Sequence, residues 1–319
     1  MKYTSIICYV ILLAAFLARS AEAELPVYLG DSHGGTLYFL VRELAPGASC
    51  TLLLFDAHDD ATAIYQSDRL RNDLRVAEAA GTTERLLARW RQLGAIQCYN
   101  WLEPLMPDRI GRVVWVAAER LGPERKRELE NVADARLDLF QETGMRSCGT
   151  LAPRLEVVSR EDLVGEPVRA EGWGDLIVSI DLDFFAEVPD ELLETAVSDV
   201  WRMVMTLPRL KAVSFAVSSP WLRDREQADH LASLALSCAA GVASAVIRFE
   251  PFIDLGPDRS NRAKDLVAAG RPVPVLELGT ATPRLMRQLV ELEPRIQTGF
   301  QPGRLRQLIA RWRSGAQPK

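Results

Sequence analysis

The chain has 319 residues, 48% of them apolar, which is enough to build a sizeable hydrophobic core. Its formal charge of -5 arises from 38 basic and 43 acidic residues that are spread along the chain. This composition argues against a largely disordered protein. The absence of a basic field argues against nucleic acid as a partner, so we expect a small-molecule substrate or ligand instead.

The first residues have the features of a secretory signal peptide. Lys2 precedes a mostly apolar run from Tyr3 to Ala18, and Ala21 and Ala23 form a small-x-small cleavage site. The apolar run is shorter than the roughly 20 residues that a membrane-spanning helix needs. We therefore expect residues 1–23 to be removed, leaving a secreted or periplasmic protein with no stable membrane span.

The rest of the chain, residues 24–319, is expected to form a single domain, because no repeat or Pro/Gly-rich linker divides it. Apolar runs typical of strands occur at Val27–Leu29, Thr51–Phe55, Val113–Ala117, Leu176–Ile180, Ala212–Val217, Ala245–Phe249 and Val273–Leu276. Segments of helical period occur at Thr36–Leu44, Thr83–Leu93, Glu124–Ala133, Asp190–Met205, Arg225–Ala239 and Thr282–Leu292. Apolar strands alternating with helices predict an α/β fold, a three-layer α/β/α sandwich with a mainly parallel sheet.

The cysteines leave two alternatives open. Cys8 lies in the expected signal peptide, and four thiols remain in a compartment that permits disulfides. Four thiols allow three pairings, and buried free cysteines are an equally good interpretation. No pair has CxxC spacing, so a thiolate metal site is not expected. The four remaining residues are Cys50, Cys98, Cys148 and Cys238.

Two of the expected strands run directly into clustered carboxylates. Asp56, His58 and Asp60 follow one strand in LLLFDAHDD, and Asp181 and Asp183 follow another in LIVSIDLDFF. Side chains two positions apart in an extended chain point the same way, so each motif presents its members on one face if the strand persists. Because parallel sheets form their sites beyond the carboxyl ends of strands, we expect the two motifs to lie together.

Converging carboxylates repel one another and are costly to bury, and a divalent metal ion removes both problems. A single Asp at a strand end is more often a helix N-cap or part of a solvated turn, but the two motifs together favour a metal site. Oxygen ligands with one or two imidazoles suit manganese, zinc or iron. Of three histidines, His33 in VYLGDSHGG follows the first strand and is a candidate ligand or a loop histidine, whereas His230 lies in a helical segment.

The motifs LGDSHGG, FDAHDD and SIDLDFF resemble, in order and spacing, the metal-binding motifs of the arginase and deacetylase (ureohydrolase-like) superfamily. A segment reading YNWLEPLMPDRIGRVVWV, with Asn100, Trp101, Glu103, Pro104 and Trp115, is similar to one in the arginase-like branch called uncharacterised protein family 0489. The resemblance extends from about Val27 to Phe185 and is weak beyond it. It implies an arginase-like fold with a paired metal centre at the sheet edge, and Mn²⁺ is the expected metal.

By this resemblance, His33, Asp56, Asp60 and Asp181 hold one ion, and His58 and Asp183 complete the second. Asp56 and Asp181 are then the bridging carboxylates. Two bridged ions lie ~3.5–4 Å apart and lower the pKa of a shared water, which supplies hydroxide near neutral pH. The implied activity is hydrolysis of a non-peptide C–N bond in an amide, amidine or guanidine.

Further roles follow from the same resemblance. Glu277, in PVPVLELGT, is similar to a late strand-end glutamate with which arginases bind guanidinium, although a plain strand-end Glu is an equal alternative. Arginases and deacetylases have a proton-transfer histidine between the two Asp motifs, and this chain has none between Asp60 and Asp181. Asn100 or Glu103 are candidates for that part of the pocket, and Glu103 could also be an exposed loop charge.

Two other functions remain open. The first is a metal-bound arginase-like binding protein that has lost catalysis together with the proton-transfer histidine. The second is a two-metal phosphoesterase, since paired metals also stabilise phosphoryl displacement. The chain has no phosphate loop of GxxxxGK[ST] type, and Arg259 and Arg262 are the only nearby candidate cations in the sequence.

Overall fold

A computed structural model describes residues 24–30, 33–58, 60, 67–93, 95–96, 98, 101–118, 122–129, 131, 154–159, 172–249, 288, 296–298, 310 and 313–314. The expected signal peptide, 1–23, lies outside these residues. So do Asn100, Cys148, Glu277, the expected strand at 273–276 and most of the expected helix at 282–292. For all of these, the sequence-based expectations stay predictions, as does the division into domains.

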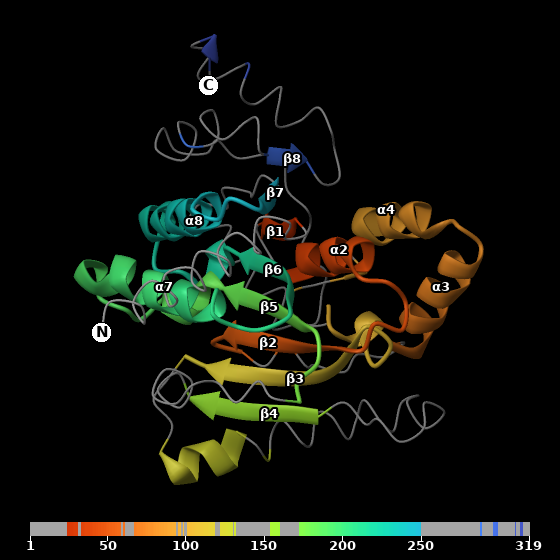
Figure 1. Cartoon of the computed structure of the whole chain (residues 1–319), viewed down its shortest axis with the longest axis horizontal. Coiled ribbons are helices and arrows are strands. Elements are labelled where there is room, and N and C mark those ends of the chain that lie inside the picture. The colour runs from red at the N-terminus through yellow and green to blue at the C-terminus, as the bar shows by residue number, and fades with distance from the viewer. Residues whose placement is uncertain are drawn as a thin grey trace, which may run out of the picture.

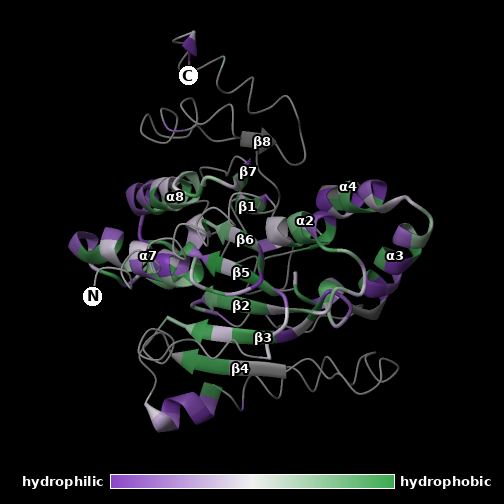
Figure 2. Cartoon of the chain, in the orientation of Figure 1, coloured by the Kyte–Doolittle hydropathy of each residue, from purple (hydrophilic) through white to green (hydrophobic). Residues whose placement is uncertain are grey.

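Among the described residues, eight strands form one sheet in which all neighbours run parallel, in the order β4-β3-β2-β5-β6-β1-β7-β8 (Figure 1). The central strands are almost entirely buried and apolar, as expected for a parallel sheet that is covered on both faces (Figure 2). The strands are β1 (Leu25–Gly30), β2 (Cys50–Asp56), β3 (Ile110–Ala117), β4 (Arg154–Ser159), β5 (Leu176–Asp181), β6 (Leu210–Ala216), β7 (Ala245–Phe249) and β8 (Ile296–Thr298).

Helices cover both faces of the sheet. In the described part of the chain they include α2 (His33–Glu43), α3 (Ser67–Ala79), α4 (Thr83–Leu93), α7 (Asp190–Val204) and α8 (Arg225–Ala240), and residues 123–129 are also helical. Three short 3₁₀ helices lie in loops: η2 (Glu103–Leu105), η4 (Leu182–Phe185) and η5 (Ser219–Trp221). In Figure 1, α7 and α8 gather on the left, and α2, α3 and α4 on the right.

Alternate side chains of each strand belong to two separate cores. In β2, Leu53 and Phe55 pack with residues of α7 and α8, whereas Leu52 and Leu54 pack with residues of α2, α3 and α4. This alternation is the period of two that an extended chain imposes. The predicted three-layer α/β/α sandwich is thereby confirmed, with α7 and α8 forming one outer layer and α2, α3 and α4 the other.

One α-helix and two strands had not been expected from the sequence. Helix α3 has a narrow apolar stripe, of which Leu70, Leu74 and Ala77 are buried, on an otherwise charged segment. Strand β4 carries Arg154 and Glu156 within six residues, which breaks the apolar run that marks central strands. Strand β8 has only three residues, too few for any periodicity.

Within the described residues, no helix has both the length and the apolar character needed to cross a membrane. Cys50, Cys98 and Cys238 are free thiols. For these three cysteines the interpretation as free thiols therefore holds.

Candidate metal centre

The first predicted motif and the second lie on neighbouring strands. Strands β2 and β5 pair in parallel, with Phe55 opposite Ile180. Asp56 and Asp181 each follow by one residue and end their strands. The sheet order thus places both motifs at the same carboxyl edge, where parallel sheets form their sites.

One group of side chains gathers around the imidazole of His33, whose Nδ1 faces three carboxylates. Its distance is 2.5 Å to Asp60 Oδ2, 3.2 Å to Asp56 Oδ2 and 3.5 Å to Asp181 Oδ2. His33 is completely buried, and none of the three carboxylates is more than 8% exposed. Ligand atoms of His33, Asp56 and Asp181 lie within 4.8 Å of one another, so these three residues can hold a metal ion.

A second group shares Asp56 and opens toward solvent. His58 Nδ1 lies 3.5 Å from Asp56 Oδ1 and 3.2 Å from Asp183 Oδ2, and the ligand atoms of all three residues lie within 4.8 Å of one another. The side chain of His58 is 54% exposed, whereas Asp183 is buried. Asp56 therefore belongs to both groups. Asp181 belongs only to the first, and Asp60 to neither.

The motifs converge by turning, because neither strand persists through its motif, which was the condition for presenting the members on one face of an extended chain. β2 ends at Asp56, whose Oδ1 accepts a hydrogen bond of 2.7 Å from the backbone N–H of His58. β5 ends at Asp181, whose Oδ1 accepts one of 3.1 Å from the backbone N–H of Asp183. Each Asp thus bends its own chain by binding the N–H two residues on, the turn that Asp favours in sequence.

Small residues bring His33 to the sheet edge. His33 is the first residue of α2, and a Cβ at either Gly30 or Gly35 would collide with the hydroxyl of Tyr28. Tyr28 is buried and stacks on Phe39, with ring centroids 5.4 Å apart, so it has little room to move. Glycine at these positions lets the start of α2 approach β1 closely.

Asp60 is held in a strained conformation beside His33. Its φ of 48° lies in the left-handed region, which non-glycine residues rarely adopt. Its Oδ2 accepts hydrogen bonds from His33 Nδ1 at 2.5 Å and from Trp101 Nε1 at 2.6 Å. Trp101 is completely buried, and its ring lies 5.0 Å from that of His33. The sequence analysis noted Trp101 as part of a motif and gave it no role.

The carboxylates dominate the electrostatics of both histidines. Burial alone would lower the pKa of His33, but the charges of Asp181 and Asp60, with a contribution from Asp56, raise it well above its usual 6.5. Hydrogen bonding to Asp183 and Asp56 raises the pKa of His58 to about 11. In the absence of metal, the carboxylates therefore favour the cationic form of both imidazoles.

The carboxylates in turn are strained by their own proximity. Burial raises the pKa of Asp181 well above its usual range, and the charges of Asp183 and Asp56 raise it further. Burial and the charge of Asp56 likewise raise the pKa of Asp183. Asp56 Oδ2 is buried and accepts no hydrogen bond, because the Nδ1 proton of nearby His33 is taken by Asp60. A divalent cation fits this donor set, since it satisfies the buried oxygen and offsets the clustered negative charge.

Three further residues reach the cluster without having been predicted. Ser218, at φ 49°, donates a hydrogen bond of 2.5 Å from Oγ to Asp181 Oδ2. Trp221 of η5 lies beside the exposed His58, with ring centroids 6.4 Å apart. Burial raises the pKa of the Cys98 thiol well above its usual value, and the charges of the nearby Asp60, Asp181 and Asp56 raise it further. No signal in the sequence marks these residues, because the loops that carry them have no periodicity.

The remaining candidates are Glu103, His230 and four residues outside the described part of the chain. Glu103 is completely buried on η2, which packs against α3, so its interpretation as an exposed loop charge is wrong. His230 lies on α8, as expected. Asn100 and Glu277 lie outside the described residues, and so do Arg259 and Arg262.

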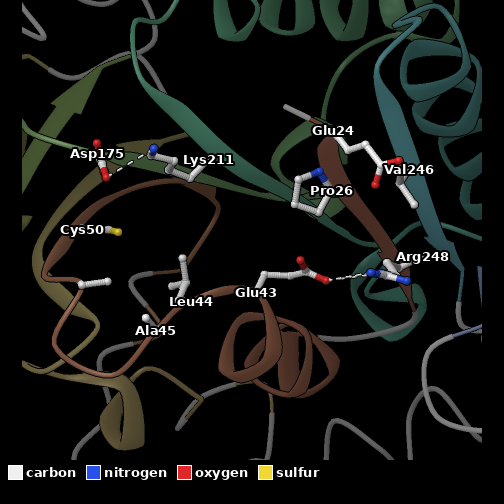
Figure 3. A pocket seen from close by; sticks show the side chains of 11 residues that line it. Glu24, Pro26, Glu43, Leu44, Ala45, Cys50, Asp175, Lys211, Val246 and Arg248 are labelled. Atoms are coloured by element: carbon white, nitrogen blue, oxygen red, sulfur yellow. Dashed lines mark hydrogen bonds and ion pairs between the residues drawn. The ribbon is translucent and has the colours of Figure 1, made fainter. Parts of the chain in front are cut away.

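A cavity of about 350 Å³ lies at the opposite, amino edge of the sheet (Figure 3). Two ion pairs line it. Lys211 Nζ lies 3.6 Å from Asp175 Oδ2, and Arg248 Nη2 lies 3.2 Å from Glu43 Oε1. The thiol of Cys50 also contributes to the wall. The described residues that line this cavity include carboxylates, but they form no group of His, Cys, Asp and Glu side chains that could hold a metal ion.

Comparison of the chain with protein-family models, with curated proteins and with solved structures finds no match.

Proposed function

We propose that the protein is a binuclear metal-dependent hydrolase that acts on a non-peptide C–N bond, such as an amide, amidine or guanidine. The observation that carries the proposal is the sharing of Asp56 by two adjacent His and carboxylate groups. A carboxylate common to two groups is the arrangement that bridges a pair of ions. Mn²⁺ is the proposed metal, with Zn²⁺ and Fe²⁺ as alternatives that the same ligands suit.

In this proposal each group holds one ion. His33, Asp56 and Asp181 hold the first, with Asp60 beside His33, and Asp56, His58 and Asp183 hold the second. Paired divalent ions supply hydroxide near neutral pH by lowering the pKa of a water molecule between them, and they polarise the bond to be broken.

The protein's own residues orient this centre and control access to it. Ser218 fixes Asp181, and Trp101 fixes Asp60, by hydrogen bonds to carboxylate oxygens. The buried first group excludes solvent, whereas the half-exposed His58 and the neighbouring Trp221 stand where a substrate can enter. A planar C–N group of the substrate would approach along this open side.

The motifs also support our proposal that the chain belongs to the arginase and deacetylase superfamily. The N-terminal apolar run, with Ala21 and Ala23 behind it, supports our proposal that the protein is exported. One observation favours a second candidate, a metal-bound binding protein without catalysis. The chain has only three histidines, two of them in the cluster, and His230 on α8 belongs to neither group, so the two groups themselves offer no third imidazole for proton transfer.

Metal analysis and an activity screen on one preparation test the proposal. Purified protein is stripped with a chelator, dialysed against Mn²⁺ or Zn²⁺, and analysed for bound metal. It is then assayed on guanidino compounds, acyl amines and phosphoesters. We expect two ions per chain and hydrolysis in one of the first two classes.

The other outcomes separate the alternatives. Two ions without turnover would favour the binding protein, and turnover of phosphoesters alone would favour a phosphoesterase. Failure to bind any divalent metal would overturn all three. Asp183→Asn is the matched variant, because it removes one ligand from the second group only, and we expect it to leave one tightly bound ion.

A further inference from the structure

Two serines of neighbouring strands form a hydrogen-bonded chain that ends on His33. Ser179 of β5 and Ser214 of β6 stand directly opposite each other in the sheet register. Ser214 Oγ donates to Ser179 Oγ at 2.9 Å, and Ser179 Oγ lies 3.1 Å from His33 Nε2. All three side chains are completely buried.

Buried hydroxyls are unusual at these positions. The neighbours on the same face of the two strands, Ile177 and Ala212, are apolar members of the core. Burying a hydroxyl without a partner is unfavourable, so serine is tolerated here because each hydroxyl has a partner. The chain of bonds leads from the core to a single imidazole nitrogen.

The two nitrogens of His33 face different surroundings. Nδ1 faces the carboxylates of Asp56, Asp60 and Asp181, and Nε2 faces the Ser179 hydroxyl. An imidazole that binds a cation through Nδ1 must carry its proton on Nε2. Ser179 Oγ has two lone pairs, of which one accepts from Ser214 and the other is available to the Nε2 proton.

We infer that Ser179 and Ser214 are positioning residues that hold His33 in the orientation and tautomer of an Nδ1 metal ligand. The inference rests on the proposed metal centre and deepens it. Histidine ligands usually donate their second N–H to a carboxylate, a carbonyl or water. A hydroxyl serves here because it accepts the proton without adding a further negative charge to a cluster that already holds four carboxylates.

The first arm of the test uses the wild-type protein and Ser179→Ala, both without metal. Because the chain has three histidines, ¹⁵N-histidine labelling gives a spectrum that His58→Gln and His230→Gln assign by elimination. We expect the Nε2 proton of His33 to exchange more slowly with water in the wild-type protein than in Ser179→Ala, because the Ser179 hydroxyl lies 3.1 Å from Nε2 and accepts this proton. A His33 that lacks an Nε2 proton, or that exchanges it equally fast in the two proteins, overturns the inference whether or not the protein binds metal.

The second arm measures Zn²⁺ and Mn²⁺ binding by titration calorimetry. Ser179→Ala should weaken one of the two sites by ~10–100-fold, the range for loss of a hydrogen bond behind a ligand, and leave the site of His58 unchanged. Ser214→Ala should weaken the same site less, because it only orients Ser179. Ser233→Ala is the matched control: Ser233 is a buried serine on α8 whose Oγ bonds Gln288, and its loss should leave both sites unchanged.

The outcomes distinguish the inference from the proposed function. If wild-type protein binds two ions and Ser179→Ala binds both as tightly, the inference is overturned and the metal centre stands. If Ser179→Ala and Ser233→Ala weaken metal binding equally, the effect is general destabilisation and the inference is also overturned. If wild-type protein binds no metal, the proposed function fails, and the exchange of the Nε2 proton still decides the role of Ser179.

Discussion

The two edges of the sheet hold acidic side chains in opposite surroundings. At the amino edge, Asp175 and Glu43 each lie within 3.6 Å of a lysine or arginine (Figure 3). At the carboxyl edge, Asp56, Asp181 and Asp183 are buried, and in the described part of the chain their only cationic partners are His33 and His58. The negative charge of the amino edge is offset by lysine and arginine side chains, whereas the carboxyl edge carries an excess of negative charge.

This difference identifies the carboxyl edge as the place for an external cation. The number of carboxylates alone is no guide, because both edges are rich in them. The edges differ in the partners of their carboxylates. At the amino edge the partner is a permanent cation, and at the carboxyl edge it is an imidazole whose proton a metal ion can displace. The following predictions test the contrast in order of decreasing effect.

The largest effect is expected from exchanging a carboxylate for an amide at each edge. Asp56→Asn removes a ligand from both groups, so Mn²⁺ affinity should fall by more than ~100-fold, beyond the range for residues behind the ligands. Asp175→Asn at the amino edge should leave metal affinity unchanged. Calorimetric titration of the two variants provides the measurement. Similar losses in both variants would mean that the edges do not differ.

An intermediate effect is expected from pH, with opposite signs in the two metal states. The folded-state pKa of His58, about 11, lies above the unfolded value of 6.5, so the folded protein binds more protons in this window. Without metal, the free energy of unfolding should therefore fall as pH rises from 6.5 toward 11. The raised pKa of Asp181 and of Asp183 acts in the same direction at lower pH, above the usual value of 3.8.

With metal bound, stability should instead rise with pH from the acid side, because the ions compete with protons for the same ligands. Denaturant unfolding at several pH values, with and without Mn²⁺, measures both slopes. His58→Gln should reduce the negative slope of the metal-free protein. Identical slopes with and without metal would contradict the assignment of the cluster as a metal site.

The smallest effect is expected at the amino edge. Glu43→Gln removes one partner of Arg248 from a partly exposed pair, and such pairs typically contribute only about 0–1 kcal/mol to stability. The bound metal should stay at the wild-type level. Thermal unfolding and metal analysis of this variant check both statements. A loss of metal would show that the two edges are coupled through the sheet.

The fold class and the cluster could be predicted because they depend on local patterns. Apolar runs alternating with helical periods indicate a parallel sheet, and two acidic motifs at strand ends then share an edge. The spacing of Asp56 and His58, and of Asp181 and Asp183, was informative for a different reason than expected. It suits a turn in which each strand-ending Asp binds the N–H two residues on.

The supporting residues could not be predicted because their positions depend on register and on loop paths. Ser179 and Ser214 are 35 residues apart and meet only because β5 and β6 pair in one particular register. Trp101 reaches Asp60 from a loop after α4. Neither contact follows from the hydrophobic period of the sequence. The period predicts where a helix or strand occurs, but it does not predict which residues of two elements come into contact.

The two aspartate turns make the shape of the centre separable from its charge. Asparagine at position 56 or 181 keeps a side-chain oxygen that can accept the same backbone N–H, so the chain can bend as before while one negative charge is lost. Replacing one carboxylate by an amide can thus remove metal binding and leave the fold unchanged. Descendants of such a chain could keep the fold and take up a different ligand at the same edge, since the scaffold does not depend on the metal to hold its turns.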